Sequence, residues 1–310
     1  MLSFHRTSHL AALLTALALA SSCGSISEVA GESDTHTATT VDVVAEFSIL
    51  ADFAEAVGGD RVRVTTLVPL GGDPHVHEPR PDDARRVADA DLVLEHGLGL
   101  SPWMNSLTQN ANGHVITVAE SVVDHAVVDD HGEVDPHLWM APPHAAQYVL
   151  TIRDALVRLD AASRDDYHRN AEAYLRQLDA VDEDLRATFV AVPHDRRLLV
   201  TPHDAYRYFA AHFELEVLGT LVGITSEEEP SAQRMREVVD AVRRTEVPAV
   251  FIESTVPPRQ IERVASEAGV EVAGPLYGDS VGEPGSDASD YLGMMRWNAE
   301  VIVDALGESP

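Results

Sequence analysis

One stretch of the chain, from Ser163 to about Val190, contains neither proline nor glycine. Its apolar side chains recur at steps of three or four, the spacing of one face of an α-helix: Tyr167, Ala171, Tyr174, Leu178, Val181, Leu185 and Phe189. An α-helix of this extent would be on the order of 40 Å long. The pattern predicts a stiff helix between two lobes, and the alternative is a long surface helix of a single domain.

Short β-branched runs alternate with helical stretches on both sides of this segment, which is typical of βα units with parallel strands. Before it, the expected strands are Val41 to Glu46, Val62 to Val68, Leu92 to Leu94 and Val115 to Val118. Helices are expected near Ile49 to Val57 and from about Pro102, where Ser101 is a natural N-cap.

After the long helix, the expected strands are Leu198 to Val200, Glu216 to Leu218, Ala249 to Ile252 and Val270 to Ala273. Helices are expected near Ala205 to His212, Ser231 to Arg244, Pro258 to Ala268 and Ser289 to Leu306. We therefore predict an α/β fold with two lobes, each a small, mostly parallel sheet flanked by helices. The predicted boundaries are 41–162 for the first lobe, 163–190 for the linking helix and 191–310 for the second lobe.

The first residues have the pattern of a targeting segment. Arg6 precedes an apolar run from Leu10 to Ala20 that is too short to span a bilayer, and Cys23, the only cysteine, follows it. This resembles a bacterial lipoprotein signal, so we expect residues 1–22 to be removed and Cys23 to carry lipid. Cleavage after Ala20, with Cys23 left as a free thiol, is the alternative. Residues 23–40 are expected to form a flexible tether.

The formal net charge of −29 argues against nucleic acid and anionic membrane surfaces as partners. It suits an extracytoplasmic protein that attracts cations, although an acidic surface can also serve solubility alone. No second apolar segment that could span a membrane is evident, so membrane contact is expected only through the lipid.

Three loops place a histidine directly after proline: Asp73-Pro74-His75, Asp135-Pro136-His137 and Thr201-Pro202-His203. With 17 Pro and 15 His, chance predicts roughly one Pro-His pair, and the chain has five. The other two, at His144 and His194, lie beside helical patterns and are expected to be surface or cap residues. A fourth loop, Tyr277 to Ser280, offers the carboxylate of Asp279.

Ligand sites of open α/β sheets lie beyond the carboxyl ends of the strands, where all four loops are expected. Three imidazoles and one carboxylate form a complete ligand set for a tetrahedral transition metal. The residues therefore predict a metal site, most of all for Zn²⁺. Its ligands would be His75, His137, His203 and Asp279.

Several motifs, taken in order, resemble the solute-binding proteins of zinc and manganese ABC importers, known as cluster A-I. They are the stretches from Val68 to His75, Glu78 to Asp82, Ala90 to Leu94, Gly97 to Leu100, Asp135 to Met140, Thr201 to Tyr206, Phe251 to Ser254 and Leu276 to Ser280. The resemblance covers nearly all of the chain after Val41. It implies two lobes joined by a long helix with limited lobe movement, a lipid anchor, and delivery of the ion to a membrane permease.

The resemblance also places the metal ligands on His75, His137, His203 and Asp279. Manganese members tend to carry glutamate where this chain has His203, and nitrogen donors suit zinc better than manganese. We therefore expect one Zn²⁺ per chain, with Mn²⁺ as the alternative and an iron carrier of the same fold as a further one.

The loop before His137 departs from the zinc members, which often carry a longer His-rich loop. Here it holds only His125 and His131 among acids that include Asp129 and Asp130. It is expected either to capture zinc weakly or contact a metallochaperone, or to be a solvated mobile loop. His77 is expected to point away from the site, and His96, His114, His168 and His212 to be surface or core residues.

A zinc hydrolase is the main alternative from another class, because catalytic zinc keeps one coordination position open for water. Four protein ligands would close that position, and the chain has no His-Glu-x-x-His pattern. A surface adhesin is a further alternative. We expect a monomeric binding protein and no enzyme.

Overall fold

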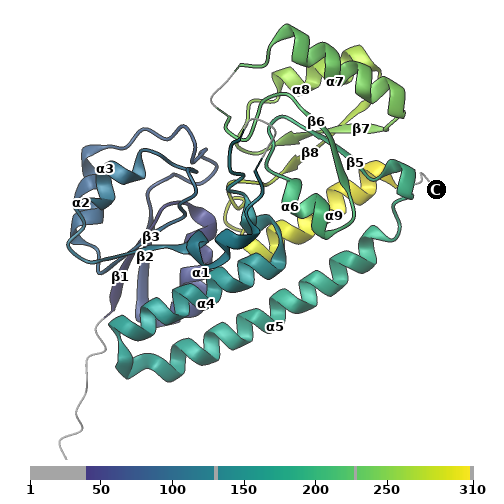
Figure 1. Cartoon of the computed structure of the whole chain (residues 1–310). Coiled ribbons are helices and arrows are strands. Elements are labelled where there is room, and N and C mark those ends of the chain that lie inside the picture. Colours follow the sequence, from purple (N-terminus) through teal and green to yellow (C-terminus); the bar gives the residue numbers. More distant parts are fainter. Residues whose placement is uncertain (1–39, 129–131, 227–228, 308–310) are drawn as a thin grey trace, which may run out of the picture. The chain divides into compact units, whose positions relative to one another are not determined.

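The computed structural model describes residues 40–128, 132–226 and 229–307, and Figure 1 shows their arrangement. The expected signal segment, Cys23 and all of the tether except Thr40 lie outside the described residues. So do Asp129, Asp130 and His131. No helix in the described part of the chain is long and apolar enough to cross a membrane.

The first lobe is built on a parallel sheet of the four predicted strands. They are β1 (Val41–Ala45), β2 (Val62–Thr66), β3 (Leu92–Glu95) and β4 (His114–Thr117), in the order β2-β1-β3-β4. Helices α1 (Ser48–Gly58), α2 (Pro81–Asp89) and α3 (Met104–Thr108) connect them, with short 3-10 turns at Gly59–Arg61 and Val118–His125.

The predicted N-cap role of Ser101 is wrong. Helix α3 begins only at Met104 and has no side-chain cap. The Ser101 hydroxyl donates instead to the carbonyl of Pro74, at 2.8 Å. A contact with a distant loop has therefore taken the hydroxyl that the local pattern assigned to the helix.

The second lobe contains the other four predicted strands as two parallel pairs. Strand β5 (Leu198–Thr201) pairs with β6 (Glu216–Thr220), and β7 (Ala249–Glu253) pairs with β8 (Glu271–Leu276). Helices α6 (Arg207–His212), α7 (Ala232–Thr245), α8 (Arg259–Ala268) and α9 (Tyr291–Leu306) flank them, and a 3-10 turn at His194–Arg196 precedes β5. The predicted α/β fold is confirmed.

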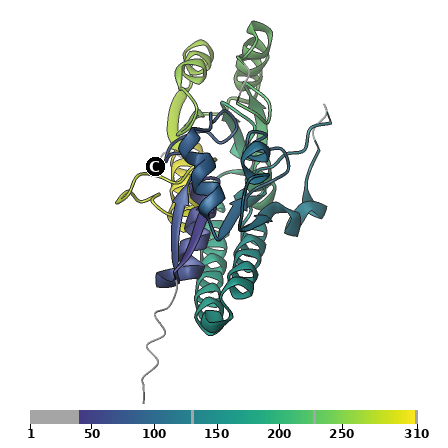
Figure 2. The same ribbon diagram turned by 90° about the vertical axis from the view of Figure 1, so that its left-hand side faces the viewer.

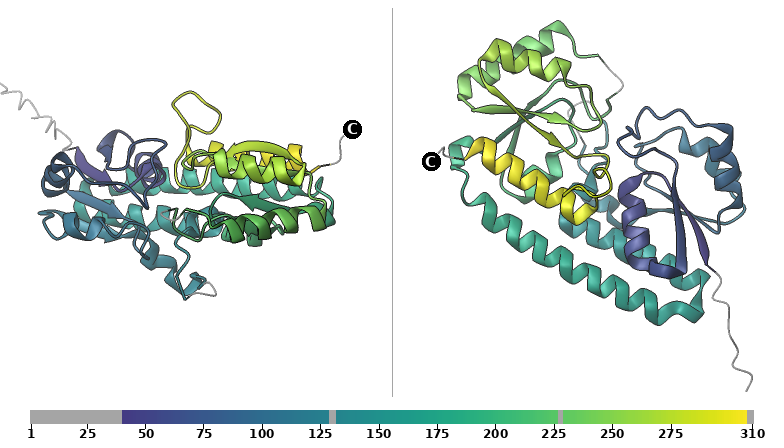
Figure 3. Two further views of the ribbon diagram at one scale, coloured as in Figure 1. Left: turned by 90° about the horizontal axis from the view of Figure 1, so that it is seen from above. Right: turned by 180° about the vertical axis from the view of Figure 1, so that it is seen from behind.

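The long helix is α5 (Arg164–Phe189), and all seven residues of its predicted apolar face are buried. It contacts α1 and α4 (Pro142–Leu159) of the first lobe and α9 of the second, and Figures 1 and 3 show it running along both lobes. Figure 2 shows α4 and α5 side by side, joined through a 3-10 turn at Ala161–Ser163. The exact lobe boundaries stay a prediction.

One hydrophobic core extends through both lobes. Phe53 of α1 lies between Tyr291 of α9 and Tyr174 of α5, with ring centroids 4.8 and 6.0 Å away. The Asp52 carboxylate accepts hydrogen bonds from the Tyr174 hydroxyl and the Tyr291 backbone amide. Because the lobes share packed side chains on α5, the fold favours small rather than large lobe movements.

Candidate metal centre

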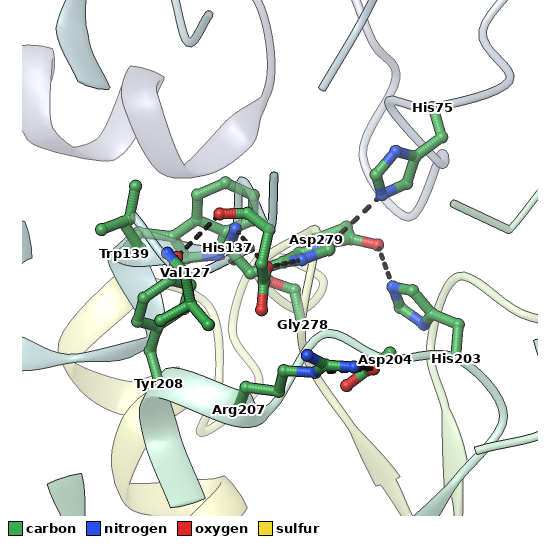
Figure 4. Close-up of polar contacts among 12 residues, drawn as sticks. His75, Val127, His137, Trp139, His203, Asp204, Arg207, Tyr208, Gly278 and Asp279 are labelled. Atoms are coloured by element: carbon green, nitrogen blue, oxygen red, sulfur yellow. Dashed lines mark hydrogen bonds and ion pairs between the residues drawn. The ribbon is translucent and has the colours of Figure 1, made fainter. Parts of the chain in front are cut away.

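The structure brings together the four residues that the sequence singled out, His75, His137, His203 and Asp279 (Figure 4). His75 lies in the loop after β2, His203 directly after β5, and Asp279 after β8, as predicted. All four side chains are buried. One possible ligand atom from each lies within 4.8 Å of the other three.

Neighbouring donor atoms have the separation that a tetrahedral ion requires. The Nε2 atoms of His75 and His137 are 3.3 Å apart. Asp279 Oδ1 lies 3.4 Å from Nε2 of His137, and Asp279 Oδ2 lies 3.2 Å from Nε2 of His203. Zinc bonds of 2.0–2.1 Å at tetrahedral angles put donors about 3.4 Å apart. The three printed separations are close to this value, and one possible ligand atom from each of the four residues lies within 4.8 Å of the others.

The prediction that His137 follows a strand is wrong. Val134 forms only an isolated bridge with Val128, and His137 precedes a 3-10 turn at Leu138–Met140. The loop is positioned by tertiary hydrogen bonds instead. The Tyr208 hydroxyl donates to the Asp135 carbonyl at 2.8 Å and accepts from the Val127 amide at 2.9 Å.

A carboxylate that the sequence analysis did not assign lies behind His137. Asp135 Oδ1 is 2.8 Å from Nδ1 of the imidazole and accepts a hydrogen bond from the His137 backbone amide. Burial alone would lower the pKa of His137, but the bonds to Asp135 and Asp279 outweigh it and raise the pKa to about 9. With Nδ1 facing Asp135, Nε2 is the atom presented to the cluster.

Glu253, at the end of β7, lies behind His203 and contacts it through both carboxylate oxygens. One carboxylate oxygen lies 2.6 Å from Nδ1 and the other accepts the His203 backbone amide at 3.1 Å. Burial would lower the pKa of His203, yet the charges of Glu253 and Asp279 raise it well above its usual range. Burial would raise the pKa of Asp279, and the two histidines hold it well below its usual range instead.

His75 differs from the other two histidines. Burial lowers its pKa to about 3, so the ring is neutral. No carboxylate of the described residues forms an ion pair with its Nδ1. Its Pro74 carbonyl accepts hydrogen bonds from the Ser101 hydroxyl and the Trp103 indole, which fix the loop to the first lobe.

The other histidines in the described part of the chain do not join the cluster. His77 packs on Trp103 with ring centroids 4.8 Å apart. His96 is a buried core residue whose Nε2 lies 2.7 Å from the Tyr148 hydroxyl. His125 is exposed and lies beside His144, with ring centroids 5.1 Å apart. The capture role predicted for His125 therefore stays a prediction.

Comparisons with known proteins agree with this geometry. The family model described as the periplasmic zinc-uptake complex component A matches residues 43–305. The chain is 35% identical over 281 residues to a manganese-binding lipoprotein of Halalkalibacterium halodurans, with 90% of this chain and 93% of that protein covered. It is 30% identical to a metal ABC transporter substrate-binding lipoprotein of Streptococcus cristatus, with 89% and 93% covered.

A solved structure has the same fold. The periplasmic zinc binding protein TroA from Treponema pallidum superposes with a TM-score of 0.84 at 29% identity, covering 87% of this chain and 100% of that one.

Fold, site and relatives together define the class: an extracytoplasmic, metal-binding substrate-binding component of an ABC transporter. Within this class, the chain belongs to the family of the periplasmic zinc-uptake complex component A. Because this family consists of transport components and not of enzymes, the zinc-hydrolase alternative is wrong.

Proposed function

We propose that the protein captures one Zn²⁺ ion between its lobes and delivers it to the permease of an ABC importer. The ligands are His75, His137, His203 and Asp279. The observation that carries the proposal is the buried cluster itself, in which four donor atoms from four loops lie within 4.8 Å of one another. Taking an imidazole or a carboxylate out of water is unfavourable unless a partner compensates for it, and a metal ion does so for all four.

The kind of donor favours zinc. Three imidazole nitrogens and one carboxylate oxygen suit a borderline-soft ion, whereas manganese prefers more oxygen donors and lies lower in intrinsic affinity. His203 decides this balance, because it is the nitrogen donor that stands where manganese members tend to carry glutamate. Asp135 and Glu253 support metal binding by these histidines, because each holds the Nδ1 side of its ring and leaves Nε2 for the metal.

Manganese is the second candidate. The relative from Halalkalibacterium halodurans is named as manganese-binding, and it is matched over 93% of its length. A competition titration with Zn²⁺ and Mn²⁺ separates the two proposals. The zinc proposal expects strong preference for zinc in the wild type and a narrower preference in His203→Glu. An unchanged selectivity ratio would remove His203 from the site or make geometry, not donor type, the basis of choice.

The ligand assignment has its own test. His75→Ala, His137→Ala and Asp279→Ala should each weaken zinc binding at least tenfold, because a closed coordination shell loses one bond. His114→Ala is the matched control, since His114 is exposed at the start of β4. Undiminished affinity in any one of the three variants would remove that residue from the site.

The proposal extends to the protein's surroundings. We propose that the chain works as a monomer anchored through lipid on Cys23, and that the loop with His125, Asp129, Asp130 and His131 meets incoming zinc or a metallochaperone. The exposed position of His125 supports the last point.

A further inference from the structure

Two of the four ligand loops are tied directly to each other. The Trp139 indole, two residues after His137, donates to the carbonyl of Gly278, next to Asp279, at 2.8 Å (Figure 4). The Tyr291 hydroxyl of α9 donates to the Trp139 carbonyl at 2.6 Å. Although His137 precedes the long helix in sequence, its loop is therefore bonded to the second lobe.

His203 belongs to the same network. Tyr208, in the helix that follows His203, bonds both Asp135 and Val127 in the His137 loop. Glu253 at the end of β7 holds His203, and the next amide, Ser254, donates to Leu276 at the end of β8 at 2.9 Å. The loops of His137, His203 and Asp279 thus form one cross-linked unit.

The His75 loop stands apart from this unit. Its Pro74 carbonyl is held by Ser101 and Trp103, both of the first lobe. Among the described residues of the second lobe, two side chains hydrogen-bond the loop. The hydroxyl of Ser280 accepts the Gly71 amide at 2.9 Å, and the hydroxyl of Ser226 donates to the Asp73 carboxylate.

Both serines are placed to set the position of His75. Ser280 is buried directly after Asp279, and its hydroxyl also lies 3.2 Å from that of Ser48 at the start of α1. The other oxygen of Asp73 accepts the backbone amide of His75 at 2.8 Å. Ser226 therefore acts on His75 through one intermediate residue, and Ser280 connects the loop to the residue beside Asp279.

We propose that Ser226 and Ser280 are positioning residues that hold His75 against the other three ligands, and that metal release begins with the withdrawal of His75. This inference rests on the proposed function. It follows from the connections among the described residues: the loops of three ligands share one network, whereas the His75 loop is joined to the second lobe by two hydroxyl contacts and the His75 ring meets His137 at 3.3 Å. Movement of the first lobe by a small amount would break these contacts and leave the other three ligands in place.

The test is the dissociation rate of Zn²⁺ or Co²⁺ from the purified chain, measured by stopped-flow mixing with excess chelator. Ser226→Ala and Ser280→Ala should each release metal about two- to tenfold faster, the range for one lost hydrogen bond. Ser226→Thr keeps the hydroxyl and should restore the wild-type rate. Thr188→Ala is the control, because Thr188 is half-buried on α5 and its hydroxyl donates to the Asp184 carbonyl of the same helix. Thermal unfolding of each variant checks the fold.

A double-mutant cycle separates a positioning role from a structural one. In a His75→Ala background, Ser226→Ala should not accelerate release further, because its route to the metal is gone. In a His137→Ala background, it should still do so. Wild-type release rates in both serine variants, or equal acceleration in both backgrounds, would overturn the inference. A wild type without metal at the four ligands would instead overturn the proposed function.

Discussion

Asp135 and Glu253 show how a single residue that binds no metal can control a metal ligand. Asp135 is hydrogen-bonded to Nδ1 of His137, and Glu253 forms an ion pair with Nδ1 of His203, so that Nε2 of each ring faces the cluster. Asparagine at position 135 could turn its amide N–H₂ toward Nδ1 instead. This would favour the tautomer of His137 that carries its proton on Nε2. We expect Asp135→Asn to weaken zinc affinity roughly tenfold, the lower end of the usual range for such partners. Chelator competition measures this, with exposed Asp124→Asn as the control; equal affinities would contradict it.

That His75, His137 and His203 lie together could be predicted from the sequence, because each follows a proline in a loop and the excess of Pro-His pairs over chance is large. The place of Asp279 beside the histidines could be predicted only because a strand was expected before its loop. The role of Glu253 could not be predicted in this way, because it lies 50 positions from His203 and meets it only after β5 and β7 are placed side by side. Asp135 is two positions from His137, and its spacing to the ligand was the signal that could have identified it.

Glu46 gives the protein a pH dependence of stability away from the metal. It is buried after β1 and accepts the His96 backbone amide at 2.6 Å. Burial raises its pKa from 4.5 to about 7, although the hydrogen bond from the His96 amide opposes the shift. Because the folded state holds this proton more tightly than the unfolded state, the contribution of Glu46 to stability is present below pH 4.5 and is lost as pH rises through about 7.

Glu46→Gln removes this titration. In metal-free protein, the free energy of unfolding of the variant should fall less steeply than that of the wild type between pH 4.5 and about 7. The difference in slope approaches about 1.4 kcal/mol per pH unit at most. Urea unfolding at a series of pH values measures it, and exposed Glu120→Gln should follow the wild type. Parallel curves for Glu46→Gln and the wild type would mean that Glu46 does not titrate in this range.

At the scale of elements, all eight strands and the long helix could be predicted. Short β-branched runs and the three- or four-residue spacing of apolar side chains can both be recognised in a local stretch of sequence. Helices α2 and α4 were not recognised, and both begin with proline, at Pro81 and Pro142. Proline in the interior of a helix tends to end it. At the first position of a helix proline is favoured, because the backbone N–H of that position has no intrahelical partner to lose. The His137 loop was misplaced because Tyr208 and Trp139, rather than a strand, position it.

The loop before His137 is the element with a proposed capture role. His125 is exposed on the 3-10 turn Val118–His125 and is not part of the four-residue cluster. We expect a variant with His125→Ala and His131→Ala to keep the equilibrium zinc affinity of the wild type but to load more slowly from dilute zinc. An acidic, histidine-bearing loop raises the local cation concentration without entering the coordination shell. Stopped-flow loading and equilibrium titration measure the two quantities, with His168→Ala as the control.

Equal loading rates would mean that the loop has no part in capture. A large loss of equilibrium affinity would contradict the account in another way, since it would make one of these two histidines a ligand of the tight site.

At the scale of the whole molecule, the shared core determines how the site can work. Phe53 of α1, Tyr174 of α5 and Tyr291 of α9 pack together, so both lobes contact α5. We therefore expect capture and release to use small displacements of the lobes. Helix packing of this kind could be predicted only in part, because the sequence shows the apolar face of α5 but not its partners.

The central claim is that one zinc ion binds to four ligands between the lobes. Crystals of the zinc-loaded protein, measured on both sides of the zinc absorption edge, test it most directly. The account predicts one strong anomalous peak, about 2.0–2.2 Å from Nε2 of His75, His137 and His203 and from the Asp279 carboxylate. A peak elsewhere, or a peak at this place that one of the four residues does not contact, would contradict it.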